Sequence, residues 1–234
     1  MNYFFYFYEK INFKMKRTVL FIMLLVSVSQ GAEINAQQLI GFKVHADPLA
    51  GWFGSDNSDI AAKSAKAGFN FGLTFNRYFH GNYAFSTGLS LVTAGGNIAY
   101  KDTVTLKLKN PIEVLPKSKL AYSIRYLAIP IGLKLRSNQI GYVSIFTNIG
   151  LDPKFILGGK VEVPSRNIAK ENADNMLSRL SMGYHVIGGI EYSVGGTSAI
   201  VLGIRFDSNF TDITKHPDAK ITHKMLGLHL GFNF

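Results

Sequence analysis

The chain has 234 residues, a formal net charge of +10 and 47% hydrophobic residues, which suits one folded domain. It contains no cysteine, so a disulfide framework and thiol chemistry are excluded. Beyond residue 36 no run of 18 uncharged apolar residues occurs, which argues against a membrane protein built from helices.

The first 36 residues have the features of an export signal. Lys16 and Arg17 form a basic start, residues 18–29 an apolar core, and Ala36-Gln37 a plausible cleavage point. This apolar segment is shorter than a membrane-spanning helix, which needs about 20 residues, so a signal peptide is favoured over a membrane anchor. No cysteine follows that would carry a lipid. We therefore predict an upstream, non-native extension at 1–14, a signal peptide at 15–36 and the mature domain at 37–234.

The mature region has the two-residue periodicity of β-strands. In the last segment Leu226, Leu228 and Leu230 alternate with Gly227 and His229. The same alternation predicts eight strands, at residues 39–51, 68–79, 83–100, 120–135, 140–157, 180–193, 199–209 and 225–234. Pro130 cannot donate a ladder hydrogen bond and predicts an irregularity in the fourth strand, and Pro153 a similar break in the fifth.

The predicted connections alternate between long and short. Long polar segments lie at 54–66, 101–119, 158–179 and 210–222, and tight turns at 80–82, 137–139 and 195–197. Outer-membrane barrels have this order when both termini are periplasmic. The predicted fold is an all-β, eight-stranded antiparallel up-and-down transmembrane β-barrel in the cell outer membrane.

A soluble lipocalin-like barrel is the alternative, with its apolar face turned inward. Alternation alone does not distinguish the two. Three features favour the membrane: the export signal, an apolar face almost without charge, and charges such as Lys43, Lys134 and Arg205 on the opposite face. Aromatic residues near the short turns fit an interfacial girdle at the periplasmic boundary. They are Tyr78, Phe79, Tyr83, Tyr142, Tyr192, Phe232 and Phe234.

Several short motifs resemble the PorT-like outer-membrane barrel family of Bacteroidota. They are Tyr126-Leu127-Ala128-Ile129-Pro130-Ile131-Gly132-Leu133-Lys134, Gly188-Gly189-Ile190-Glu191-Tyr192, Gly203-Ile204-Arg205-Phe206 and residues 226–232. The resemblance implies a small eight-stranded barrel, and its founding member is associated with type IX protein secretion. Ala128 stands where the family typically has a glutamate, so an inward carboxylate is missing here. A shared fold does not fix a shared function.

Polar residues on the inward face predict a structural network in a plugged lumen, because eight strands leave an interior just wide enough for side chains. Buried charges need partners. The expected members are Lys43, Lys134, His185, Glu191, Arg205, Asp207 and His229, with His45 beside them. A proton or ion path, or a catalytic pair of histidine and acid, is the functional alternative.

The loops carry no enzyme motif, so we expect no catalytic activity, no cofactor and no metal site. Asp56, Asp59, Asp212 and His216 could lie at an outer rim, and Asp212, His216 and Asp218 share one loop. Their spacing matches no known constellation. Residues 168–177 could form a short amphipathic helix, although a solvated loop is the simpler expectation.

The leading functional hypothesis is a small barrel with a structural or partner-binding role through its outer loops. The alternatives are an accessory factor of a protein secretion system, an outer-rim hydrolase or acyltransferase, and a narrow ion pore. Expected partners are outer-membrane lipid, the barrel-assembly machinery acting on Phe232 and Phe234 as an insertion signal, and secretion-complex proteins. Nucleic acid is not expected, because no run of basic residues lies along one face.

Overall fold

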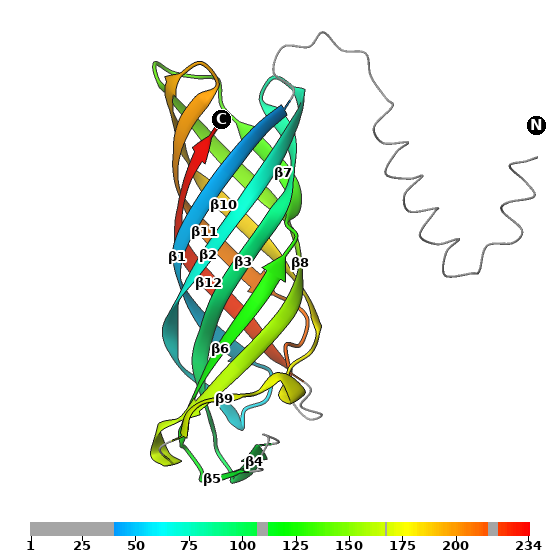
Figure 1. Ribbon diagram of the computed structural model, residues 1–234, viewed down its shortest axis with the longest axis vertical. Coiled ribbons are helices and arrows are strands. Elements are labelled where there is room, and N and C mark those ends of the chain that lie inside the picture. Colours follow the sequence, from blue (N-terminus) through cyan, green and yellow to red (C-terminus); the bar gives the residue numbers. More distant parts are fainter. Residues whose placement is uncertain (1–39, 107–111, 167, 215–219) are drawn as a thin grey trace, which may run out of the picture. The chain divides into compact units, whose positions relative to one another are not determined.

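The computed structural model describes residues 40–106, 112–166, 168–214 and 220–234 (Figure 1). The two segments predicted at 1–14 and 15–36 lie outside these ranges. The strands are β1 Ile40–Ser55, β2 Ile60–His80, β3 Tyr83–Tyr100, β4 Val104–Leu106, β5 Ile112–Val114, β6 Lys119–Ala128, β7 Ile131–Arg136, β8 Val143–Val163, β9 Ile168–Asn172, β10 Leu180–Gly195, β11 Ser198–Asn209 and β12 Ile221–Asn233. Two short 3₁₀ turns, Pro164–Arg166 and Asp174–Met176, are the helical elements of this part of the chain.

The long strands close into an antiparallel ring of eight positions. Each pairs with its neighbour in sequence, and β12 returns to β1, where Val44 lies opposite Phe232 and Ser55 opposite Ile221. β6 and β7 share one position, because both pair with β3 on one side and β8 on the other. The predicted eight-stranded up-and-down barrel is confirmed.

Pro130 explains why that position holds two strands. β6 ends at Ala128 and β7 begins at Ile131, so the ladder is interrupted at the proline as predicted. Ile129 still donates its backbone N–H to the carbonyl of Pro153 at 2.9 Å. The break expected at Pro153 is wrong, because β8 runs through it without interruption.

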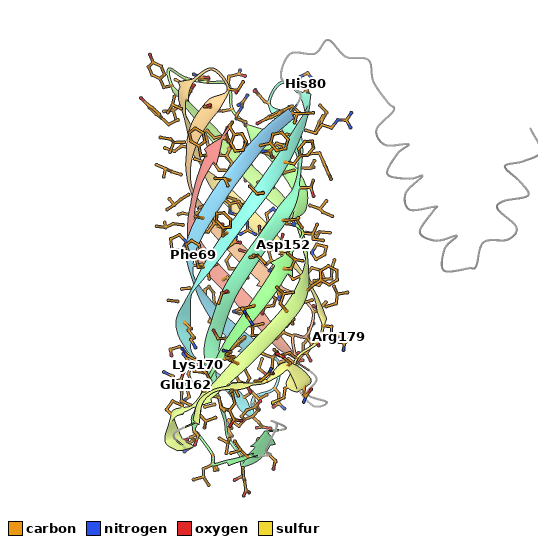
Figure 2. All side chains as sticks on the ribbon, in the orientation of Figure 1. Phe69, His80, Asp152, Glu162, Lys170 and Arg179 are labelled. Atoms are coloured by element: carbon orange, nitrogen blue, oxygen red, sulfur yellow. The ribbon has the colours of Figure 1, made fainter. Side chains whose placement is uncertain are left out.

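Large apolar side chains cover the outside of the ring. Phe69, Phe71 and Leu73 on β2 are each about half exposed, whereas Asn70, Gly72 and Thr74 between them are buried. Figure 2 shows Phe69 at the outer wall. Leu202 and Ile204 repeat the pattern on β11, and Leu228 and Leu230 repeat it on β12. An apolar exterior of this kind requires hydrocarbon around it.

Most of the predicted aromatic girdle is exposed, with one exception. Phe79, Tyr83, Tyr142, Tyr192, Phe232 and Phe234 all have large exposed fractions. Tyr78 is half-buried and turns toward Lys134, whose ammonium lies 5.9 Å from the centre of its ring. The expectation for Tyr78 was wrong because the alternation of β2 places it on the inward face.

The strands extend further toward the long connections than predicted. Residues 54–66 form no long loop, since β1 continues to Ser55 and β2 begins at Ile60. Residues 158–163 belong to β8, and residues 168–177 form β9 and a 3₁₀ turn instead of an amphipathic helix. Figure 1 shows β9 and the β4–β5 hairpin at the end opposite the last residue of β12. We call these the long-loop end and the short-turn end.

The interior divides into two regions. An apolar core near the long-loop end includes Phe53, Ile98, Leu120, Tyr122 and Ile124. Charged and amide side chains occupy most of the remainder toward the short-turn end, together with a small apolar cluster of Phe146, Ile187 and Val201. Within the described ranges no helix has the length and apolar character needed to cross a bilayer.

Candidate functional site

The seven residues predicted to face the lumen all lie inside the barrel. Each is at most 4% exposed. They come from five strands, and the alternation of each strand places them inward: Lys43 on β1, Lys134 on β7, His185 and Glu191 on β10, Arg205 and Asp207 on β11, and His229 on β12. Together with Asp47, Asp152 and Lys154 we call them the polar network.

Asp47 organises the first part of the polar network. Its two carboxylate oxygens accept hydrogen bonds from Nδ1 of His45 at 3.1 Å and Nδ1 of His229 at 2.9 Å. The amide of Asn70 donates to the same carboxylate at 2.8 Å. Asp47 is fully buried, so these three donors replace the water that an ionised carboxylate would otherwise bind.

The contacts determine which nitrogen of His229 carries its proton. The Lys43 ammonium lies 2.8 Å from Nε2 of His229 and can only donate. Nε2 must therefore accept, and Nδ1 carries the hydrogen that is given to Asp47. Lys43, His229 and Asp47 thus form a directed chain in which each polar group has a partner.

A second part joins Asp152 to β10 and β11. Asp152 lies 2.7 Å from Nδ1 of His185 and 3.4 Å from the Arg205 guanidinium. Arg205 also donates two hydrogen bonds of 2.8 Å to Asp207, in the bidentate geometry that suits guanidinium and carboxylate. Lys154 lies 3.9 Å from both Asp152 and Asp207.

A third part lies nearer the short-turn end. The Lys134 ammonium donates to Glu191, which also accepts a hydrogen bond from the side-chain amide of Asn233 at 2.9 Å. Phe146 lies between this part and the first, with the ammonium groups of Lys134 and Lys43 at 5.4 and 5.8 Å from its ring centre. The ring face attracts both cations.

The formal charges of the buried network cancel. Four cations, Lys43, Lys134, Lys154 and Arg205, are matched by four anions, Asp47, Asp152, Glu191 and Asp207. Three of these eight, Asp47, Asp152 and Lys154, were not predicted as members. The signal was present, because continued alternation from Lys43 and His45 reaches Asp47, and from Asn148 and Gly150 it reaches Asp152 and Lys154.

The apolar core holds one further histidine that the sequence did not single out. His223 is completely buried, and its Nε2 donates to the carbonyl of Gly95 at 3.3 Å. Its Nδ1 therefore accepts from the Tyr126 hydroxyl at 2.8 Å. Tyr126 and His223 are thus satisfied within an otherwise apolar layer.

Three residues of this region are arranged in sequence like the nucleophile, base and acid of a catalytic triad. Ser90 lies 3.4 Å from Nε2 of His45, whose Nδ1 bonds to Asp47. All three are at most 2% exposed, and Ser90 packs against the backbone at Gly72. A substrate has no access to this serine, so we interpret the three residues as structural.

The same region contains three side chains that could hold a metal ion. Ligand atoms of His45, Asp47 and His229 lie within 4.8 Å of one another. The two Nδ1 atoms already donate to Asp47, and the Lys43 ammonium is bonded to the other nitrogen of His229. A cation beside a metal ligand opposes metal binding, so we interpret the group as a hydrogen-bonded cluster.

The described loop residues that were considered as a catalytic rim are engaged in contacts within and between the connections. Asp212 accepts from the backbone N–H groups of Thr214 and Ile221, at 2.9 and 3.0 Å. Asp56 accepts from the backbone N–H of Lys220, and Asp59 forms an exposed ion pair with Lys101. His216 and Asp218 lie outside the described residues.

Comparison with solved structures found several small outer-membrane barrels of low sequence identity. Neisserial surface protein A is 14% identical, with 82% of this chain and 95% of that protein covered and a TM-score of 0.48. The outer-membrane protein OprG from Pseudomonas aeruginosa is 15% identical, with 86% of this chain and 99% of that protein covered and a TM-score of 0.43. The outer-membrane protease OmpT from Escherichia coli is 9% identical, with 86% of this chain and 99% of that protein covered and a TM-score of 0.44. The search of curated proteins gave no match.

A family model described as outer membrane protein beta-barrel domain matches residues 25–215. That range contains the strands from β1 to β11, and β12 completes the ring. The match agrees with the apolar exterior and places the protein in the outer membrane. The chain belongs to the outer membrane protein β-barrel domain family.

Proposed function

We propose that the protein is a non-conducting outer-membrane barrel that acts through its long-loop end. The observation that carries this is the filling of the interior. The polar network pairs its charges near the short-turn end, and the apolar core lies beyond it with Leu120, Ile124 and Tyr126 fully buried. An ion leaving the polar network would enter an apolar layer, where an unpaired charge is costly.

The long-loop end supplies the surface for such a role. The β4–β5 hairpin and β9 lie there, and Val104 and Ile112 of the hairpin pack against the apolar core. Leu115, just after the hairpin, is 56% exposed. Loops held by a rigid barrel are suited to contact a macromolecular partner.

Single-channel recording in planar bilayers tests the closed lumen. We expect no unitary conductance from the purified barrel. The triple variant Leu120→Ala, Ile124→Ala, Tyr126→Ala, which hollows the apolar core from β6, should admit ions if it folds. Reproducible unitary currents from the unmodified protein would refute the proposal.

Site-specific photocrosslinking in cells tests the use of the long-loop end. A photoreactive residue at Leu115 should give discrete protein adducts, whereas the same residue at lipid-facing Leu202 should give none. Adduct patterns that are the same at both positions, or absent from Leu115, would contradict a partner-binding role.

We also infer that the protein is not an enzyme, because the carboxylate of Asp212 is occupied by backbone donors. Peptide or phospholipid turnover by the purified barrel, lost in Asp212→Ala, would overturn this.

A role in protein secretion is the narrower alternative. It is supported by the segment from Tyr126 to Lys134, which resembles the PorT-like family, and by the interruption at Pro130 within it. Ala128 is buried at the position where the PorT-like family typically has a glutamate, and this difference weakens the assignment of that family's role to this protein. Deleting the gene and measuring export of surface proteins tests the role, and unchanged export would exclude it.

A further inference from the structure

Four exposed cations follow the edge of the apolar exterior at the long-loop end. Arg125 lies two residues from Leu127 on β6, and Lys224 two residues from Leu226 on β12. Lys160 lies three residues beyond Leu157 on β8, and Arg179 directly precedes Leu180, the first residue of β10. All four side chains are exposed, and we call them the basic girdle.

Strand pairing brings three of the four to neighbouring positions of the ring. Arg125 of β6 lies opposite Gly158 of β8, and Lys160 lies opposite Ser123, two residues away. The carbonyl of Arg179 accepts from the backbone N–H of Ile156 at 2.9 Å, which places it beside the same part of β8. Figure 2 shows Arg179 on the outside of the barrel. Lys224 lies opposite Trp52 and Ser208, elsewhere on the ring.

The basic girdle differs from the interior cations in its lack of direct ion pairs within the described part of the chain. Among the described residues, none of its members forms an ion pair, whereas Lys134 and Arg205 inside the barrel are bonded to carboxylates. Two acids lie near these cations. Glu162 is two residues beyond Lys160 on β8, opposite Ala121. Asp174 lies beside Gly158, the residue opposite Arg125, and its carboxylate accepts hydrogen bonds from the backbone N–H of Gly159 and the side-chain amide of Asn172. The girdle therefore carries an excess of positive charge, with four cations near two acids.

The depth of these cations in the membrane indicates which groups they can contact. The apolar exterior ends where hydrocarbon ends, so the basic girdle lies at the depth of the lipid headgroups. In an outer-membrane barrel the long connections face outward, which makes this the outer leaflet. Each lysine or arginine near an anionic membrane surface contributes about 1 kcal/mol, and arginine also matches phosphate in a bidentate geometry.

We propose that the basic girdle binds the phosphate groups of lipid headgroups in the outer leaflet. The proposal rests on the membrane position of the barrel and not on the role assigned to its loops. The adjacent positions of Arg125, Lys160 and Arg179 suit a headgroup that carries more than one phosphate.

Lipid titration of the folded barrel tests this assignment. The unmodified protein and the variant Arg125→Gln, Lys160→Gln, Arg179→Gln, Lys224→Gln are placed in zwitterionic detergent and titrated with bisphosphorylated lipid A. Bound lipid is counted by native mass spectrometry. The control, Lys101→Gln, Lys117→Gln, Lys170→Gln, Lys220→Gln, removes four exposed charges that are not girdle members, three from the connections and one, Lys170, from β9.

We expect the girdle variant to bind lipid A at least about tenfold more weakly, because four surface contributions are lost. The control should stay within about twofold, because its charges lie beyond the headgroup level. Lipid A without phosphates should bind all three proteins equally, and millimolar inorganic phosphate should not displace the lipid. Single substitutions at Arg125 and Arg179 give the same comparison should the quadruple variant not fold.

Equal loss of affinity in the girdle and control variants would overturn the proposal, since net charge alone would then explain binding. Undiminished binding of dephosphorylated lipid A to the unmodified protein would overturn it as well. Displacement by inorganic phosphate would show a site for the free anion instead of a lipid.

Discussion

At the residue scale, the interior shows how a barrel can hold eight charges without a water-filled lumen. Each anion has a charged or histidine partner on another strand or two residues away, as Asp47 has in His45 and His229. Burial makes an unpaired charge expensive, so the network is useful only when it is complete. Asp47 is the member with the largest number of neutral donors around it.

Replacing Asp47 by asparagine should therefore be strongly destabilising. The amide keeps the shape but removes the anion that faces Lys43 and two histidines, and breaking a buried charged cluster costs about 3–5 kcal/mol. The free energy of unfolding, measured by urea titration in lipid vesicles, checks this. Asp59→Asn is the control, and it should cost less than about 1 kcal/mol because its ion pair with Lys101 is exposed.

The pair of Lys134 and Glu191 should show strong coupling. Lys134→Met leaves the buried Glu191 carboxylate with only Arg136, 3.8 Å away, as a cationic partner, and Glu191→Gln leaves a buried ammonium. Each should cost about 3–5 kcal/mol, the lysine variant toward the lower value. The double variant should cost clearly less than the two added together, because neither charge is stranded. Strict additivity in a double-mutant cycle would show that the two groups do not interact.

The sequence predicted the inward residues wherever alternation was regular. Lys43, Arg205 and His229 were placed by counting in twos, and Asp152 and Lys154 would have been reached by counting further along β8. The partners could not be predicted in this way, because the bond of Lys43 to His229 depends on β12 closing onto β1. That contact joins residues near opposite ends of the domain.

At the scale of the elements, strand ends were the least predictable feature. Residues 60–66 were expected in a loop because they belong to the long polar segment 54–66, yet they lie in β2. Register shifts between Ala62 and Ala65, and between Lys66 and Phe69, break the pattern there. A bulge places two residues opposite one, so a period of two is lost even though the pairing continues.

Glycine on the inward face allows β2 to approach the polar network. A Cβ on Gly72 would lie 2.3 Å from the Ser90 hydroxyl and 2.7 Å from Nε2 of His45. Gly72→Ala should therefore destabilise the barrel by about 1–3 kcal/mol through overpacking. Gly188→Ala is the matched control, since a Cβ there meets nothing within 4 Å and should change stability by less than about 0.5 kcal/mol.

Urea titration of both alanine variants measures the difference directly. A cost at Gly188 equal to that at Gly72 would mean that the inward and outward faces of the barrel are packed alike.

At the scale of the whole molecule, the barrel follows from one repeated choice, an apolar residue outward and a small or polar residue inward. The sequence shows this choice over most of the mature chain, and Pro130 marks the interruption in the fourth predicted strand. The apolar core at the long-loop end was not predicted, because its inward members, such as Ile98 and Ile124, reverse the rule that polar residues face the lumen.

Cysteine accessibility along β3 tests the central claim, that the apolar face meets lipid and the inward face is sealed from water. The chain contains no cysteine, so single variants report one position each. Ser86 and Ser90 are at most 3% exposed on the inward face, and Leu89 is 54% exposed on the outer face.

Ser86→Cys and Ser90→Cys in reconstituted vesicles should not react with a small charged thiol reagent until the barrel is denatured. A fluorophore attached at Leu89→Cys before refolding should be quenched by brominated lipid. Rapid labelling of the two inward cysteines in the folded barrel, together with no quenching at position 89, would contradict the account.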